Sequence, residues 1–233
     1  MHTIPATCAI PAACATFPPM RHILHTTGLL LLAFIVQGCA TPERFDQAVE
    51  IYEKLDPQVV EYQPVGDSKI DGLCRPFMTS ANQFKAEVAK EYAAIAGTPV
   101  SKKFNKLTPE EIPDAYAKLD DTDRKAVDDW VRSSAKADST RTANMLKQAE
   151  DLAKAGAQLA IEIVNASKGG AGGTAGLISS VASAMSEQGQ KAKAQVDTAT
   201  DYIGASQKMI STWQKVSAKV TETVNANIRK AQA

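Results

Sequence analysis

Histidine and cysteine are scarce in this 233-residue chain, and most of them lie near its start. All 3 histidines and 2 of the 4 cysteines fall within the first 25 residues: His2, His22, His25, Cys8 and Cys14. The rest of the chain has no imidazole to act as the base of a Ser-His or Cys-His nucleophile. Zinc sites that need histidine or four cysteines are excluded there as well. We therefore expect no enzymatic activity, no metal and no cofactor.

The chain also has no proline in its C-terminal half, few aromatic residues and a formal net charge of zero. The last of its 11 prolines is Pro113, and aromatic residues make up 6% of the sequence. This composition favours helices packed through small side chains, so we expect an all-α fold. The 26 basic and 26 acidic residues cancel, which removes the electrostatic case for nucleic acid as a partner.

Residues 20–38 have the pattern of a secretory signal peptide. Arg21 supplies a basic start, and residues 29–36 form a short apolar run. That run is much shorter than the ~20 residues that a membrane-spanning helix needs. Residues 1–19 do not fit the pattern, because they are rich in proline and contain no lysine or arginine. We expect Met20 to be the true start and 1–19 to be an upstream extension.

The signal-like segment ends in Val36-Gln37-Gly38-Cys39, which resembles the lipobox of bacterial lipoproteins, although Gln37 replaces the usual small residue. The resemblance implies cleavage between Gly38 and Cys39, a lipid on the Cys39 thiol and a further acyl chain, such as palmitate, on its new amino group. Chains of this kind anchor a protein to a membrane. Ala40 stands where an aspartate would retain such proteins in the inner membrane, which implies an outer-membrane location facing the periplasm. The alternative is an ordinary signal-peptidase site beside a buried thiol.

Residues 39–121 are expected to form a proline-containing helical base. A first helix is predicted to begin at Thr41, where a capping hydroxyl precedes a proline and an acid. Residues 59–76 predict a loop with at most one short helix, because they hold prolines and glycines at short intervals. A second helix is expected over 77–96. A capping box predicts a third, short helix, and its sequence is Thr108-Pro109-Glu110-Glu111.

Residues 122–233 predict a long antiparallel helical hairpin. Its arms are expected over 123–168 and 174–230, and the polar stretch Ser133–Thr142 is expected to fray, to bend or to face solvent. A turn is predicted at 169–173, because four glycines would lose too much backbone entropy in a helix. They are Gly169, Gly170, Gly172 and Gly173. A mostly apolar seven-residue repeat marks the second arm. Its two sets are Ala175, Ala182, Gly189, Val196, Ile203, Ile210, Ser217, Val224 and Ile178, Met185, Ala192, Ala199, Ser206, Trp213, Val220, Asn227.

The tip of the hairpin has more than one interpretation. Lys168–Thr174 looks like a phosphate loop, but it lacks the lysine-serine or lysine-threonine ending and a preceding strand, so a plain turn is preferred. Residues 169–186 carry no charge. Contact with a membrane or a partner is therefore an alternative use of the tip. The residues that would make it are Leu177, Ile178, Val181 and Met185.

The remaining cysteine, the two tryptophans and the clustered acids can each be interpreted as structural or as functional residues. Cys74 is expected to be a buried thiol, with a disulfide between subunits as the alternative. Trp130 and Trp213 are expected to pack in the core at similar heights of the two arms. The dense acids lie at expected helix starts and on solvated faces, which makes a catalytic pair the less favoured interpretation. They are Glu110, Glu111, Asp120, Asp121, Asp123, Asp128 and Asp129.

These features predict a lipid-anchored envelope protein with a structural or adaptor role. The membrane would hold it through Cys39, and the hairpin would contact a protein partner or a second copy. The alternative is a membrane-active protein that inserts the uncharged 169–186 tip, as helical pore-forming toxins do. An enzyme or small-ligand carrier that uses the acids of 110–129 is a third interpretation.

Overall fold

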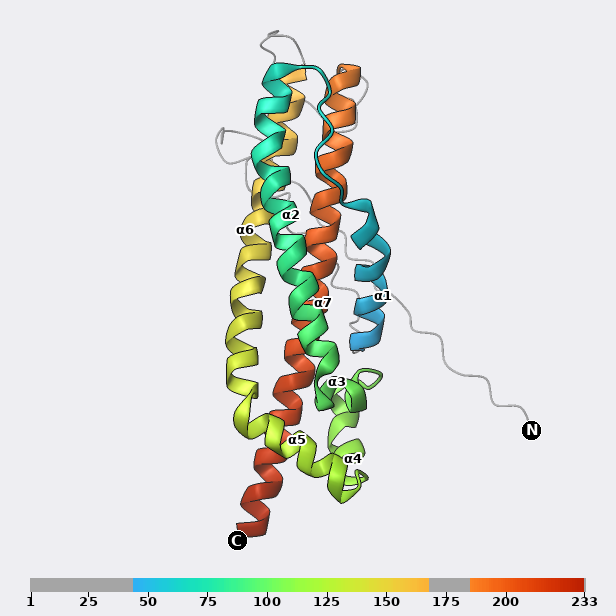
Figure 1. The fold of residues 1–233 in the computed structure, drawn as a ribbon, viewed down its shortest axis with the longest axis vertical. Helices are drawn as coiled ribbons and strands as arrows, with labels where there is room; N and C mark the ends of the chain where they lie inside the picture. The colour runs from blue at the N-terminus through green and yellow to red at the C-terminus, as the bar shows by residue number, and fades with distance from the viewer. Residues whose placement is uncertain (1–43, 168–184, 233) are drawn as a thin grey trace, which may run out of the picture. The chain divides into compact units, whose positions relative to one another are not determined.

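The computed structural model describes residues 44–167 and 185–232, and Figure 1 shows that they form helices. Neither range contains a β-strand, so the expected all-α class is confirmed for this part of the chain. The contacts place the described helices in one compact unit. In chain order they are α1 Phe45–Leu55, η1 Asp56–Gln58, α2 Ser68–Gly97, α3 Pro99–Phe104, η2 Pro109–Glu111, α4 Ile112–Ala117, α5 Asp121–Ser133, α6 Ala135–Ser167 and α7 Glu187–Gln232.

α1 follows the amphipathic pattern of its sequence. It buries Phe45, Ala48 and Tyr52 on one face, and Asp46 in its first turn complements the helix dipole. The predicted start at Thr41 is wrong for this helix, because Arg44 is in an extended conformation and α1 begins only at Phe45.

The connection between α1 and α2 is fixed to two helices. Gln63 N donates to Oε1 of Gln195 on α7 at 2.8 Å, and Gln195 Nε2 donates to the Gln63 carbonyl at 3.0 Å. Lys85 Nζ on α2 donates to the carbonyls of Asp56 and Val59 at 2.5 and 2.9 Å. Backbone polar groups of this irregular segment are thereby satisfied.

The loop predicted over 59–76 is wrong in its second half, because α2 already begins at Ser68. The Asp67 carboxylate accepts hydrogen bonds from the backbone N–H groups of Lys69 and Ile70 at 2.9 and 3.2 Å. These bonds satisfy two of the first amide groups of the helix, which have no partner within it.

Pro76 lies inside α2, although an interior proline costs about 3 kcal/mol. It removes the hydrogen bond to the carbonyl of Gly72, and both residues are exposed, so water can reach that carbonyl. The same turns bury Cys74 and Phe77. Burial of a large apolar side chain contributes about 1.5–3 kcal/mol, so a few such residues offset the cost of the proline.

Three short helical elements, α3, η2 and α4, connect α2 to α5. The pattern of Gly97 and Pro99 indicates only the end of α2, and the structure adds α3 directly after it, with the Thr98 hydroxyl accepting from Ser101 N at 3.0 Å. The expected capping box at Thr108 is confirmed and begins η2, which continues into α4.

The first arm, expected as one helix over 123–168, is divided in two. The Asp120 carboxylate accepts from Asp123 N at 2.8 Å and caps α5, which ends at Ser133. Ser134 then leaves the helical conformation at φ −126° and ψ −29°, and α6 follows. The break falls inside the polar stretch that was expected to fray, to bend or to face solvent.

α6 and α7 pack against each other in antiparallel directions, as Figure 1 shows. Residue numbers rise along α6 as they fall along its neighbour. Three contacts define this register: Asp138 with Trp213, Gly156 with Thr200 and Ser167 with Gly189. The glycines at 169–173 that were predicted to join the two arms lie outside the described residues.

α7 is the central helix of the unit, because α1, α2 and α6 all pack on it. Between Gly189 and Val224 every position of the predicted repeat is buried, whereas Asn227 is exposed. The repeat positions Ala175, Ala182 and Ile178 lie outside the described residues. α7 also buries a set that the repeat did not include, because it has neighbours on more than one side. That set contains Tyr202, Met209, Val216 and Thr223.

Candidate functional site

Most residues predicted to be functional lie outside the described ranges. These are Cys39 and Gly38 of the lipobox, the glycines of 169–173, and the tip residues Leu177, Ile178 and Val181. The fourth tip residue, Met185, is described, and its side chain is buried at 7% exposure. Within the described ranges no helix is both long and apolar enough to cross a membrane.

Most of the acids that could have formed a carboxylate pair have structural partners. Asp120 caps α5, and Glu111 completes the capping box of η2. The other pairings are Asp123 with Lys103, Asp128 with the Tyr116 hydroxyl at 2.7 Å, and Asp129 with Lys125 at 2.5 Å. Where the chain is described, no group of three or more His, Cys, Asp or Glu residues is arranged to hold a metal ion.

A buried ionic cluster joins α2, α6 and α7, and sequence reasoning missed it. We call it the Asp138 cluster; its members are Glu91, Asp138, Arg141 and Trp213. Trp213 Nε1–H donates to Asp138 Oδ2 at 2.8 Å, and Arg141 Nη2 donates to Asp138 Oδ1 at 3.1 Å. Arg141 also donates to Glu91, from Nε to Oε2 at 3.0 Å and from Nη2 to Oε1 at 3.2 Å. Charge-assisted bonds of this kind fix the register of the three helices.

Burial dominates the electrostatics of the Asp138 cluster. It raises the pKa of Asp138, and the hydrogen bond from Trp213 and the charge of Arg141 oppose that rise only in part. The bonds to Glu91 raise the pKa of Arg141. The Arg141 side chain is half exposed, so water screens its ion pairs. Two carboxylates share one guanidinium, and the tryptophan supplies the remaining donor.

Trp213 is also the centre of an aromatic group. Its ring centroid lies 5.4 Å from that of Phe45 on α1 and 6.1 Å from that of Trp130 on α5, the latter in edge-to-face geometry. Trp213 is fully buried and Trp130 is 8% exposed. Both tryptophans therefore pack in the core and at one level, as expected.

Cys74 is a free and fully buried thiol, as the favoured interpretation predicted. Burial raises its pKa. Asp71 nearby accepts hydrogen bonds from the Tyr62 hydroxyl and from Val65 N, both at 2.8 Å. The bond from Val65 is the main cause of the lowered pKa of Asp71. These contacts hold the start of α2 against the preceding connection.

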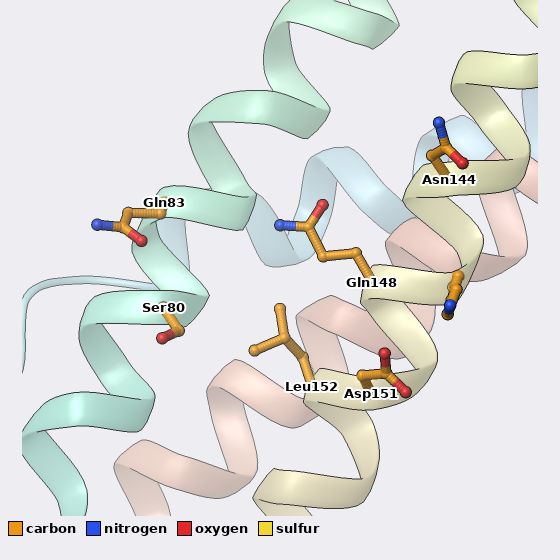
Figure 2. A pocket seen from close by; sticks show the side chains of 7 residues that line it. Ser80, Gln83, Asn144, Gln148, Asp151 and Leu152 are labelled. Carbon is orange, nitrogen blue, oxygen red and sulfur yellow. The ribbon is translucent and has the colours of Figure 1, made fainter.

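A groove runs along the surface between α2 and α6, and Figure 2 shows part of it. This part has a volume of about 460 Å³ and mostly polar walls, and in the figure Gln148 and Leu152 project from α6 toward α2. A second hollow of about 360 Å³ shares Ser80 and Leu152 with it and continues along the same two helices. That hollow is more apolar, with Leu73, Pro76, Phe77 and Leu159 in its walls. We call the two together the α2–α6 groove.

The outward side of α6 beside this groove is unusually apolar. Ile161 is 55% exposed, and Glu162 is the only charged residue from 155 to 167. Ala157, Ala160 and Val164 lie at helical spacing around Ile161 and are exposed or half-buried. We call these four residues the α6 strip. No motif in the sequence marks these four residues as a surface.

Comparisons of this sequence with protein-family models, with curated proteins and with solved structures give no match. Its function is therefore argued from its own residues.

Proposed function

We propose that this chain is a lipid-anchored envelope protein with a structural or adaptor role, which acts through protein–protein contacts of a helical hairpin. Cys39 would carry the lipid and place the protein on the outer membrane, facing the periplasm. The glycines of 169–173 would join α6 and α7 into the hairpin. The antiparallel packing of these two helices supports this connection, because Ser167 and Gly189 lie close together at the ends that residues 168–186 link.

The α6 strip is the observation that carries the proposed contact. A solvent-facing helix side normally bears charged residues, and this one has a half-exposed isoleucine among alanines and a valine. Apolar side chains flanked by small residues allow another helix to approach closely. Burying Ile161 against a partner would remove apolar area from water and so favour association.

The α2–α6 groove supports the same face as a binding surface. It adjoins the strip, because its walls include Gln158 and Glu162 of α6, which neighbour Ile161 on the helix. One part of the groove offers apolar contacts and the other offers amides such as Gln83 and Gln148. A mixture of apolar and polar contacts is typical of protein interfaces that form and separate.

Site-specific photo-crosslinking at position 161 tests the contact. A photoreactive amino acid would replace Ile161 in the membrane-anchored protein, and the same residue at Ile51 on α1, which is 41% exposed, is the matched control. We expect a discrete adduct from position 161 that Ala157→Asp prevents, and none from position 51. Equal adducts from both positions, or none from position 161, would contradict the proposed contact.

Metabolic labelling with palmitate tests the anchor separately. Label should enter the wild-type protein and the Cys74→Ala variant and be absent from Cys39→Ser, because the Cys74 thiol is buried. Label that persists in Cys39→Ser would overturn the lipid anchor. Density-gradient separation of the membranes then reports the location, and recovery with the inner membrane would overturn the outer-membrane assignment.

A further inference from the structure

A second groove, away from the α2–α6 groove, opens between α7 and the junction of α5 with α6. Its volume is about 900 Å³. Figure 1 shows where α5 and the beginning of α6 meet the last third of α7. We call it the basic groove, for the charges described below.

The basic groove is long and has small apolar residues along it. On α7 its wall extends from Ser211 to Asn225, which corresponds to about 21 Å of helix at 1.5 Å per residue. Val131 and Ala135 on one side and Ala218 on the other provide apolar contacts. A hollow of this length with small side chains can accommodate about four turns of another helix.

Three cations border the basic groove. Arg132 and Lys136 lie on the α5–α6 side and Lys215 lies on α7. All three side chains are exposed, and none has an ion pair within 4.0 Å among the described residues. Arg132 has longer-range effects on Tyr116 and on Asp129, and the pKa of Asp129 is lowered mainly by its hydrogen bond with Lys125.

The wall contains one acid, Glu222, and that acid is already neutralised. Lys219 Nζ donates to Glu222 Oε2 at 3.0 Å. The unpaired charge at the groove is therefore positive, although the chain as a whole is neutral. An occupant with acidic groups along its edges would complement it, and charges at the rim of an interface chiefly raise the rate of association and its specificity.

We propose that the basic groove binds an amphipathic helix of a protein partner, with an apolar stripe against Ala135 and Ala218 and acidic side chains beside Lys136 and Lys215. The concave, elongated form fits a rod better than the flat surface of a bilayer. Double-stranded nucleic acid needs a wider and more densely charged face than three cations provide. This site is separate from the α6 strip and does not depend on the lipid anchor.

Binding of a designed peptide to the full-length protein tests the proposal. The probe is a fluorescent peptide of about 20 residues, long enough to form a helix, with leucine and alanine on one face and glutamate on both flanks. A second peptide carries lysine in place of each glutamate. Fluorescence anisotropy should show binding of the glutamate peptide, weaker binding at higher salt, and no binding of the lysine peptide.

Two variants separate the contribution of the lysine charges to peptide binding from the contribution of contacts inside the groove. The double variant Lys136→Glu/Lys215→Glu should bind the glutamate peptide about tenfold more weakly, whereas the matched double variant Lys69→Glu/Lys90→Glu, with exposed lysines on α2, should bind as the wild type does. Ala218→Phe keeps all charges and partly fills the groove, and it should weaken binding about as much. All five residues are exposed, so circular dichroism should show folded proteins.

The following results would overturn the proposal: equal binding of both peptides, no peptide binding at all, or unchanged binding by Ala218→Phe. A further experiment measures binding of the protein to vesicles of phosphatidylcholine with phosphatidylglycerol. Vesicle binding that depends on Lys136 and Lys215 without any peptide binding would assign the cations to lipid headgroups. If the variants change only a monomer–dimer equilibrium, the occupant is a second copy of this chain, and the proposal is wrong.

Discussion

The two ends of the α6–α7 contact are built from different kinds of residue. At one end, which we call the aromatic end, Trp213 packs against Phe45 and Trp130 and donates to Asp138. At the other, which we call the small-residue end, Gly156 meets Thr200 and Gly189 meets Ser167. The aromatic end draws on α1 and α5 as well, because a fully buried tryptophan needs neighbours on every side.

This difference separates a stabilising end from a candidate binding end. Large side chains at the aromatic end bury much apolar area and use their polar atoms within the core. At the small-residue end the helices approach closely through glycine, and aliphatic side chains such as Ile163 and Val196 are buried there instead of tryptophan. The α6 strip begins next to Gly156, so the proposed partner contact lies at the small-residue end.

Trp213→Ala should have the largest effect on this comparison. We expect the free energy of unfolding to fall by about 3–5 kcal/mol, because a large cavity forms and Asp138 loses a donor. Trp213→Phe keeps a ring but removes the N–H group, and it should cost about 1–3 kcal/mol. Urea titration followed by circular dichroism measures both. Equal stability of Trp213→Ala and the wild type would refute the central role of the aromatic end.

Gly156→Ala should reveal how closely the small-residue end is packed. An added methyl group would lie 2.5 Å from Oγ1 of Thr200 and 3.0 Å from Cζ of Phe77, so neighbours must shift at a cost of about 1–3 kcal/mol. Gly204→Ala on α7 is the matched control, because its methyl group meets no atom within 4 Å. It should stabilise the helix by about 0.5–1 kcal/mol. Thermal unfolding of both proteins would show the opposite signs, and a shared sign would argue against the close contact.

Asp67→Ala should lower the free energy of unfolding by about 1 kcal/mol, because two amide groups at the start of α2 lose their acceptor. The exposed neighbouring substitution Ser68→Ala should change it by less than about 0.5 kcal/mol. Urea titration compares the two variants. A loss as large in Ser68→Ala would mean that the Asp67 cap is not the cause.

Asp138→Asn should have the smallest effect, on pH dependence. Folding raises the pKa of Asp138 above its ordinary 3.8, so the unfolded chain loses this proton first as pH rises. The stability linked to this group is present below about pH 3.8 and is lost as pH rises through the folded pKa. The stability of the wild type relative to Asp138→Asn should thus fall as pH rises above about 3.8. Urea titrations across that range check it, and a constant or rising difference would contradict the raised pKa.

The elements predicted with success are those whose signals are local. The capping box at Thr108 and the start of α5 after Asp120 depend on hydrogen bonds between residues three positions apart. The seven-residue repeat of α7 likewise follows from helical spacing alone, and its positions from Gly189 to Val224 are buried. These features need no knowledge of the remaining chain.

The elements that failed depend on distant residues. α2 continues through Pro76 because its turns are buried against other helices, which a window of prolines and glycines does not reveal. The polar stretch around Asp138 looked suited to solvent, yet Asp138 and Thr142 are buried. Asp138 meets its donor Trp213 75 positions later in the chain. None of the residues of the α6 strip or of the basic groove carries a motif that would single them out.

The sequence alone was enough for the helical class, for the starts of η2 and α5 and for the lack of imidazole after His25, since each follows from residue type and near-neighbour spacing. Packing decided which polar groups became core and which apolar groups stayed on the surface. The cost of burying Asp138 depends on whether Trp213 and Arg141 reach it, and the exposure of Ile161 depends on which side of α6 faces α7. Such free energies arise from contacts between residues far apart in the chain, so no local pattern contains them.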